Sequence, residues 1–370
     1  MIDAITQHGG LTQVELAGAT GLSPATISNI VKELSASGVL DTRASTRSGR
    51  RASYVTIAHA AGIVAGIHFS ARHLRVVISD ANRTVLSETH MPLARAHRAD
   101  NELDRAALLL ADMLAGMNSS VDKLLGIGIA LPAPLRQPVG MVARNGILSG
   151  WSGVDVPHVM EDLLKRPVFV DNASNLAALA EARTGAGRGK DTLVFIDLDH
   201  GIGSGLILGG RLFRGHTGAA GELGHTVIRE GGPVCRCGNR GCLEAIAGGP
   251  ALIDQLEPEH GSMKLGDIVI RAVEGDPRTL RVLADAGRHI GLAVANLCNL
   301  LDPERVVIGG ELARSGELIL GPIRHAMERS VIVGPEAAPE VVQGQLGSHA
   351  AARGAVIHAI DNVSLQSNVS

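Results

Sequence analysis

A cysteine-rich segment constrains the fold of this chain more than any other feature of its sequence. The segment, GHTVIREGGPVCRCGNRGC at residues 224–242, holds one histidine and three of the chain's four cysteines. Its glycines allow the backbone to fold back, so that distant side chains can meet. Thiolate and imidazole groups are the ligands that zinc prefers. The segment therefore predicts a tetrahedral zinc site with four protein ligands, His225, Cys235, Cys237 and Cys242.

A site whose four positions are filled by protein has none left for a reactive water molecule, so a structural zinc is expected. The alternative is reduced cysteine without metal. Cys298, which has apolar neighbours at helical spacing, is expected to be a core thiol. Glu222 and Glu244 flank the cluster, so a zinc-held loop would fix two carboxylates beside His225. Such carboxylates suit the vicinal hydroxyls of a sugar, and the alternative is that both are ordinary surface residues.

Composition indicates a globular α/β protein. The 370 residues are 45% hydrophobic but include only one Trp, one Tyr and four Phe, so aliphatic side chains must build the cores. The net charge of −3 excludes a generally basic coat, and DNA binding would need a local patch. No segment has a signal-peptide layout, and no apolar run approaches the roughly 20 residues that span a bilayer. We therefore expect a cytoplasmic protein without a membrane partner, in which clustered cysteines favour metal over disulfides.

Residues 12–34, TQVELAGATGLSPATISNIVKEL, predict two helices around a short turn. Thr12 and Glu15 form a capping box for the first helix, and Gly21 ends it. Ser23, followed by proline, is a strong start for the second helix. The apolar side of this helix faces the domain core, and its small and polar side chains suit reading base edges in a major groove. The residues assigned to DNA are Ala25, Thr26, Ser28, Asn29 and Lys32.

The next stretch, VLDTRASTRSGRRASYVTI, has strand-like ends around a glycine-containing loop and predicts a β-hairpin wing. Its arginines would neutralise phosphates or probe the minor groove. The wing residues assigned to DNA are Arg47, Arg50 and Arg51. The alternative is a winged helix used for protein contacts, with a solvated charge run. The occurrence of helix, turn, helix and basic hairpin together favours DNA.

Beyond a small-residue linker near residues 58–62, strand and helix signals alternate. Strands are expected in GIVAGIHFSARHLRVVISDANRTVLSETHMPL, with Asp80 to Asn82 as a hairpin turn, and in LLGIGIALPAP. Helices are expected at residues 100–118 and after the strand and double glycine of LDPERVVIGG. This succession predicts an α/β body of two lobes with a cleft between them. The glycines of DHGIGSGLILGG invite a dinucleotide-binding interpretation, but a strand continues where that motif needs a helix. A hairpin whose glycine turn faces a ligand fits better, and a turn without a ligand is the alternative.

Several motifs of the body resemble the ROK family, which groups repressors, open reading frames and sugar kinases. They are GIGIALPAP, VDNASNLAALAE, DHGIGSGLILGG, AGELGHTVIREGGPVCRCGNRGCLE and LDPERVVIGG, in family order within residues 63–360. With the predicted winged helix ahead of them, the chain resembles the repressor branch. The resemblance implies a two-lobed actin-like (ribonuclease H-like) sugar-kinase fold, a structural zinc on the four ligands above, and a sugar site at the cleft. By the family motif, the effector contacts would be Asn172, Glu222, His225 and Glu244.

Three departures from the kinase pattern separate the two branches of the family. Family kinases carry an aspartate as general base after VDN, and this chain has Ala173 there. Their first phosphate loop has the form DxGGT, whereas residues 68–72 read HFSAR. In the second loop the expected threonine is His200. The resemblance therefore implies a protein that is not an enzyme but keeps its zinc ligands and most sugar contacts.

The sequence predicts a sugar-responsive, DNA-binding transcriptional regulator of the repressor type. The alternative is an ATP-dependent sugar kinase of the hexokinase type with a DNA-binding appendage, and a third possibility is an interaction module that binds neither DNA nor sugar. The expected partners are double-stranded operator DNA with an inverted repeat, a sugar or sugar derivative, and further copies in a homodimer or homotetramer. The expected domains are a winged helix at 1–60, a first lobe at 61–180 completed by a helix at 350–366, and a second lobe at 181–349 with a zinc loop at 225–242.

Overall fold

The computed structural model divides the chain into two compact units. The described residues are 1–2, 4–5, 10–36, 39–47, 50–57, 62–94, 97–136, 140–142, 148, 150–334 and 336–367, without the side chains of 44–47, 50–52, 57 and 364–367. The first unit comprises Met1–Leu131, Asp155–Asp171 and Ala355–Ser370, and the second comprises Pro132–Val154 and Asn172–Gly354. The three domains expected from the sequence stay a prediction, and their boundary at residue 60 lies outside the described residues.

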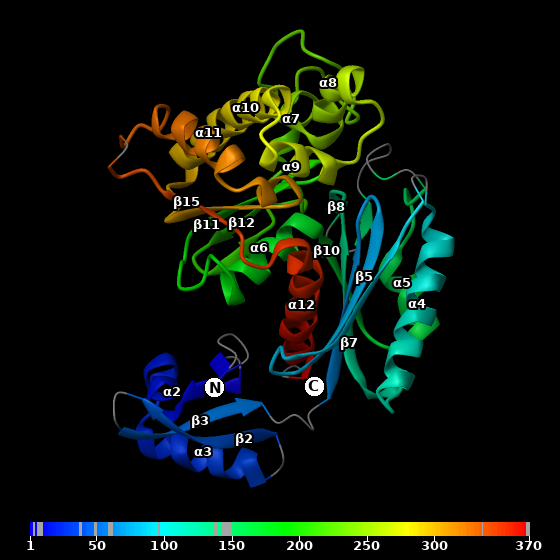
Figure 1. Cartoon of the computed structure of the whole chain (residues 1–370). Coiled ribbons are helices and arrows are strands. Elements are labelled where there is room, and N and C mark those ends of the chain that lie inside the picture. The colour runs from blue at the N-terminus through cyan, green and yellow to red at the C-terminus, as the bar shows by residue number, and fades with distance from the viewer. Residues whose placement is uncertain are drawn as a thin grey trace. The chain divides into compact units, whose positions relative to one another are not determined.

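The N-terminal region is a winged helix-turn-helix (Figure 1). Its elements are β1 (Leu11–Thr12), α2 (Gln13–Thr20), α3 (Pro24–Ala36), β2 (Leu40–Arg47) and β3 (Arg50–Ile57). The predicted capping box of α2 is present, with Glu15 N 3.3 Å from Thr12 Oγ1, and Gly21 ends the helix in the left-handed region. Ser23 Oγ accepts a hydrogen bond from Thr26 N at 3.1 Å and caps α3. The antiparallel pairing of β2 with β3 confirms the predicted hairpin.

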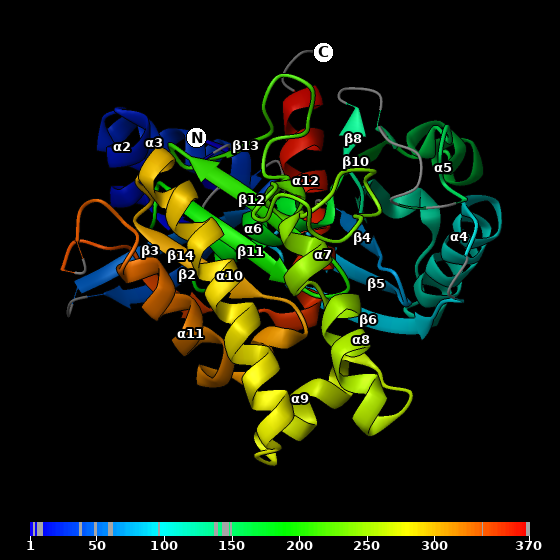
Figure 2. The ribbon, with the colours of Figure 1, turned by 90° about the horizontal axis from the view of Figure 1, so that it is seen from above.

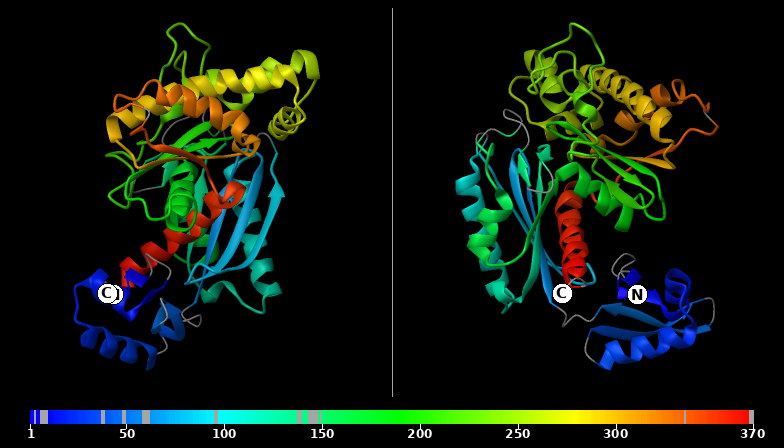
Figure 3. Two further views of the ribbon diagram at one scale, coloured as in Figure 1. Left: turned by 60° about the vertical axis from the view of Figure 1, so that its left-hand side comes forward. Right: turned by 180° about the vertical axis from the view of Figure 1, so that it is seen from behind.

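A five-stranded mixed sheet in the order β10-β7-β4-β5-β6 also belongs to the first unit. Its strands are β4 (Ile63–Phe69), β5 (His73–Asp80), β6 (Val85–Pro92), β7 (Leu124–Leu131) and β10 (Val168–Asn172). Figure 3 shows the helices that cover it, α4 (Ala99–Gly116) and α5 (Val156–Leu164) on one face and the C-terminal part of α12 (Ala350–Ser367) on the other. A side chain at Gly128 of β7 would overlap the carbonyl of Ala355, so glycine lets α12 pack directly on the sheet.

The second unit is built on another five-stranded sheet, in the order β13-β12-β11-β14-β15. Its strands are β11 (Leu193–Leu198), β12 (Ile202–Leu208), β13 (Arg211–Phe213), β14 (Arg305–Gly309) and β15 (Glu340–Gln343). Figure 2 shows α10 (Pro277–Leu301) and α11 (Glu317–Glu328) over one face, and α6 (Ala173–Thr184) covers the other. The remaining elements of this unit are β8 (Leu135–Arg136), β9 (Met141–Val142), η3 (Leu223–His225), α7 (Leu243–Ala247), α8 (Gly249–His260), α9 (Leu265–Val273), η4 (Leu312–Ser315) and η5 (Gly347–His349).

The elements expected in the body are present with shifted boundaries. The helix expected at residues 100–118 is α4. Residues 199–201 join β11 to β12, and because these strands pair antiparallel, the dinucleotide-binding interpretation of this glycine segment does not apply. The helix expected after LDPERVVIGG begins only at α11, since Gly316 at a φ of 58° separates it from the 3-10 turn η4. Within the described ranges, no helix is long and apolar enough to cross a bilayer.

Candidate metal centre and ligand site

The metal loop, which we define as residues 225–242, runs from the end of η3 to the start of α7. A bridge between Val227 and Cys242 closes it at its base. Gly241 has a φ of 71°, and a side chain there would overlap the carbonyl of Arg229. Glycine is therefore required where the chain returns past itself, and this return brings the four predicted ligands into one place.

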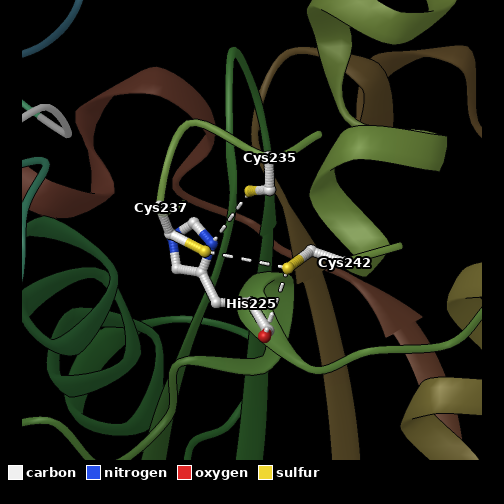
Figure 4. Close-up of side chains that lie close together, drawn as sticks. All are labelled: His225, Cys235, Cys237 and Cys242. Atoms are coloured by element: carbon white, nitrogen blue, oxygen red, sulfur yellow. Dashed lines mark hydrogen bonds between the residues drawn. The ribbon is translucent and has the colours of Figure 1, made fainter. Parts of the chain in front are cut away.

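The four side chains converge, as Figure 4 shows. Cys235 Sγ lies 3.5 Å from His225 Nδ1, and Cys237 Sγ lies 3.7 Å from Cys242 Sγ. All four ligand atoms lie within 4.8 Å of one another. Bonds of about 2.3 Å to sulfur and about 2.1 Å to nitrogen would place tetrahedral zinc ligands about 3.8 Å (two sulfurs) or about 3.6 Å (sulfur and nitrogen) apart. The residues fit a zinc ion.

The electrostatics of the cluster also favour a cation. The three cysteines are buried. Burial, with a contribution from the neighbouring thiols, raises the pKa of Cys242 to about 12, and burial also raises the pKa of Cys235. Thiolates in such surroundings need a compensating positive charge, which a divalent metal supplies. Cys298 is buried on α10 in the main core of the second unit, as expected for a core thiol.

His225 connects this cluster to the first of the predicted effector residues. Its Nδ1 faces Cys235, whereas its Nε2 lies 3.8 Å from Glu222 Oε2. Burial raises the pKa of Glu222 to about 7; the negative charge of Glu244 adds to the rise, and Arg236 opposes it. Glu222, His225 and Glu244 therefore share one electrostatic neighbourhood of the second unit, as the sequence predicted.

Glu244 forms a bidentate ion pair that was not predicted from the sequence. Arg236 Nε lies 2.6 Å from Glu244 Oε1, and Arg236 Nη2 lies 2.9 Å from Oε2. Ile202 N donates a further hydrogen bond to Oε2 at 2.9 Å. The ion pair joins residues eight positions apart across an irregular loop, where no periodicity applies. The one sequence signal for it was an arginine between two ligand cysteines.

Asn172 has a structural role in addition to the predicted sugar contact. Its Oδ1 accepts hydrogen bonds from Ser174 N at 2.8 Å and Asn175 N at 3.4 Å, and so caps α6. Its Nδ2 donates to the carbonyl oxygen of Ala133 at 3.0 Å. The preference of asparagine for N-cap positions could have indicated this role. Ala173 follows as the first residue of α6 and is buried.

A second group of polar residues lies where β11 leads into β12. Asp197 Oδ2 is 3.5 Å from Ser174 Oγ. Loss of hydration raises the pKa of Asp197 to about 7; Asp199 adds to the rise and the Ser174 hydroxyl opposes it. Asp199 Oδ1 accepts a hydrogen bond from His200 N at 2.7 Å and lies 2.9 Å from His200 Nδ1. A side chain at Gly203 would overlap Ser174 Oγ, so the start of β12 packs against the N-terminal end of α6.

The predicted DNA contacts lie on the open side of α3. Ile27 and Val31 are buried in the core of the winged helix and fix the orientation of α3. The opposite side exposes all five residues that the sequence assigned to base reading, Ala25, Thr26, Ser28, Asn29 and Lys32. The ends of β2 and β3 carry the wing arginines, whose side chains lie outside the described part of the structure; they are Arg47, Arg50 and Arg51.

Two family models match the chain. Residues 1–41 match a winged helix-turn-helix DNA-binding family, and residues 64–362 match the ROK family. The fold and these matches define a class, proteins that carry a DNA-binding winged helix ahead of a sugar-kinase-like body. The chain belongs to the ROK family.

Known proteins from both branches of the family are similar to this chain. The xylose repressor of Bacillus subtilis is 27% identical over 368 residues, covering 98% of this chain and 94% of that protein. A glucokinase from Halalkalibacterium halodurans is 34% identical over 251 residues, covering 62% of this chain and 76% of its own length. The crystal structure of a ROK family transcriptional regulator, a homolog of the Escherichia coli MLC protein, is 24% identical with a TM-score of 0.78 and covers 95% of this chain and 92% of that one. This likeness confirms the predicted fold.

Proposed function

We propose that the protein is a sugar-responsive, DNA-binding transcriptional repressor of the ROK family. The observation that carries the proposal is a winged helix with an exposed polar face on α3, joined in one chain to a ROK body. The similarity to the xylose repressor extends over 98% of the chain and so includes this winged helix. The similarity to the glucokinase covers only 62%.

In the proposed DNA complex, α3 enters the major groove. Ser28, Asn29 and Lys32 would hydrogen-bond base edges, and the methyl groups of Ala25 and Thr26 would contact thymine methyls. The wing would bind phosphates or the minor groove through Arg47, Arg50 and Arg51. A homodimer or homotetramer would present two winged helices to the half-sites of an inverted repeat.

The proposed effector site lies in the second unit, around Asn172, Glu222, His225 and Glu244. Carboxylate oxygens accept hydrogen bonds from sugar hydroxyls, and the electrostatic coupling of Glu222 to Glu244 supports their action on one ligand. Because Asn172 Oδ1 already accepts two backbone hydrogen bonds, the sugar contact of Asn172 falls to its amide NH₂ group, which also holds Ala133.

We also propose a structural zinc ion bound by His225, Cys235, Cys237 and Cys242. The ion would stabilise the metal loop, since four protein ligands close the site and zinc binding adds to folding free energy. Glu222 would then hold the second ring nitrogen of His225, as carboxylates commonly do for zinc-bound histidines. The metal would thereby help to keep Glu222 and Glu244 in place.

A sugar kinase with a DNA-binding appendage is the second candidate, and the glucokinase similarity favours it. Against it stands Ala173, which cannot take a proton from a sugar hydroxyl. The HFSAR loop is a tight hairpin turn, in which Ser70 Oγ accepts hydrogen bonds from Arg72 N at 3.2 Å and His73 N at 2.9 Å. The sequence of this loop also lacks the glycines that let backbone N–H groups approach phosphates. We accordingly propose that the protein is not an enzyme.

In vitro selection from random double-stranded DNA with the full-length protein tests the repressor proposal. We expect enrichment of one sequence with inverted-repeat symmetry. A gel-shift titration on that sequence, repeated with D-xylose, D-glucose and related sugars, should then show that at least one sugar changes the affinity for DNA. Absence of any enriched sequence would contradict DNA reading. If one DNA sequence is enriched but no sugar in a broad panel changes the affinity for it, the proposed sugar response would be contradicted and the proposed DNA reading would stand.

A further inference from the structure

The contact between Arg236 and Glu244 joins the metal loop to the proposed effector site. Arg236 lies between Cys235 and Cys237, two residues of the candidate zinc cluster, so a bound zinc would fix its backbone on both sides. Its guanidinium group donates hydrogen bonds to both oxygens of the buried Glu244 carboxylate, from Nε to Oε1 at 2.6 Å and from Nη2 to Oε2 at 2.9 Å. Such fork-like pairs fix orientation as well as charge.

The surroundings of Glu244 leave its carboxylate little freedom. Oε2 accepts hydrogen bonds from both Ile202 N and Arg236 Nη2, and Oε1 accepts one from Arg236 Nε. A side chain at Gly201 would overlap Glu244 Oε2 and Arg236 Nη2, so the loop packs tightly against the ion pair. Three donors therefore set the plane of this carboxylate, and two of them belong to one side chain of the metal loop.

From this arrangement we propose that Arg236 is a positioning residue, which orients Glu244 for the effector and makes effector affinity depend on the order of the metal loop. The inference rests on the proposed function, in which Glu244 contacts a sugar. A mobile Glu244 would pay an entropic penalty on binding and would meet the sugar hydroxyls in fewer of its rotamers. Loss of metal would act in the same way, because it releases the backbone that carries Arg236.

The test compares the zinc-loaded full-length protein with Arg236→Gln, Arg236→Lys, Glu244→Gln and the Arg236→Gln/Glu244→Gln double variant. Arg240→Gln is the matched control, since Arg240 is an exposed arginine on the same loop. Calorimetric titration with D-xylose and D-glucose gives affinities, and elemental analysis gives the zinc content. We expect Arg236→Gln to retain its zinc and to bind sugar about tenfold more weakly, Arg236→Lys to be intermediate, and Arg240→Gln to be unchanged.

The double variant separates positioning from a general loss of structure. If Arg236 acts through Glu244, the substitution Arg236→Gln should cause little further loss once Glu244 is glutamine, because coupled residues are non-additive. Fully additive losses would overturn the proposal. The proposal would also be overturned if zinc-loaded Arg236→Gln bound sugar as tightly as the wild type, or more tightly. Arg236 would then have no effect on sugar binding or would compete with the sugar for Glu244.

A measurement without sugar keeps the link testable if the effector proposal fails. Release of zinc to a chromogenic chelator should be several-fold faster in Arg236→Gln and in Glu244→Gln than in the wild type or Arg240→Gln. The double variant should release zinc no faster than either of these single variants. Equal release rates in all variants would overturn the connection between Glu244 and the loop. Wild-type protein that binds no sugar, with faster release in both single variants, would contradict the effector assignment and support the mechanical link.

Discussion

At the scale of the residue, Asp197 makes the stability of the protein depend on pH. Its pKa of about 7 lies above the ordinary value of 3.8, mainly because the folded chain removes water from it. An acid whose folded pKa is raised holds its proton in the native state while the unfolded chain releases it. Its contribution to stability is therefore greatest below the unfolded pKa and falls as the pH rises through about 7.

Asp197→Asn should remove this dependence, because the amide has the same shape and no charge to dehydrate. We expect the variant to gain melting temperature relative to the wild type, with a larger gain at pH 8 than at pH 5. Scanning calorimetry across this range measures the difference, and Asp254→Asn on the exposed side of α8 serves as the control. A gain that is equal at both pH values, or larger at pH 5, would contradict the assigned shift.

The two kinds of cysteine should respond differently to substitution. Cys237→Ser is expected to lower both zinc content and melting temperature, because it removes one of four ligands. Cys298→Ala is the control: it opens a small cavity in the core, costing about 1–2 kcal/mol, and should leave zinc content unchanged. Elemental analysis should find about one zinc per chain in the wild type. Wild-type protein that is free of zinc after purification without chelators would refute the metal assignment.

The candidate metal cluster was predictable from the sequence, because residue type and spacing together indicate that His225 and the three cysteines can meet in one loop. The side-chain contacts around this cluster were not predictable from the sequence. Arg236 reaches Glu244 only because the loop folds back, and the position of a guanidinium group after such a fold is set by tertiary packing. The same holds for Ser174 and Asp197, which come from α6 and β11 and meet across a helix–sheet contact.

At the scale of the element, α3 and the wing should differ in what they contribute to DNA binding. Asn29→Ala is expected to relax sequence preference, because an amide that reads a base edge contributes about 1–3 kcal/mol of discrimination. Arg50→Ala should weaken binding to all sequences and reduce the slope of the salt dependence by about 1, since it removes a phosphate contact. Fluorescence anisotropy on selected and random DNA at several salt concentrations measures both effects. Equal effects of the two substitutions on selected and random DNA would contradict this division.

Element types followed from the sequence more readily than their ends. The turn between β5 and β6 was predicted at Asp80, whose Oδ1 accepts hydrogen bonds from Asn82 N at 2.9 Å and Thr84 N at 2.8 Å. Such local side-chain contacts are encoded within a few residues. The delayed start of α11 depends instead on how η4 packs between α9 and α11, which the local pattern does not contain.

At the scale of the whole molecule, both units are assembled from segments that lie far apart in the sequence. β4 pairs in parallel with β7, where Ile63 and Leu124 are partners about sixty residues apart. β11 pairs in parallel with β14, where Leu193 and Arg305 are partners more than a hundred residues apart. Parallel pairings over such separations have no local signature, so the alternation of strand and helix signals predicted only a two-lobed α/β body, and the family resemblance supplied its actin-like architecture. A repressor of this construction responds to a sugar only to the extent that the sugar binds its DNA-competent and DNA-incompetent conformations with different affinity.

The same body carries a catalytic prediction, because the proposal that the protein is not an enzyme rests on more than one position. If only the general base were missing, Ala173→Asp would restore phosphoryl transfer. We expect it to remain inactive, since the β4–β5 turn has Ser70 closing a tight hairpin and His200 is paired with Asp199 where kinases have a threonine.

A coupled assay for ADP release, with ATP, magnesium and each sugar of the panel, should give no sugar-dependent rate for the wild type or for Ala173→Asp. A ROK glucokinase provides the positive control. The decisive contrary result would be sugar-dependent ADP release by the wild type that Asn172→Ser abolishes. Serine keeps an oxygen that can cap α6 but lacks the amide NH₂ assigned to the sugar, so loss of activity in that variant would reflect sugar binding rather than misfolding.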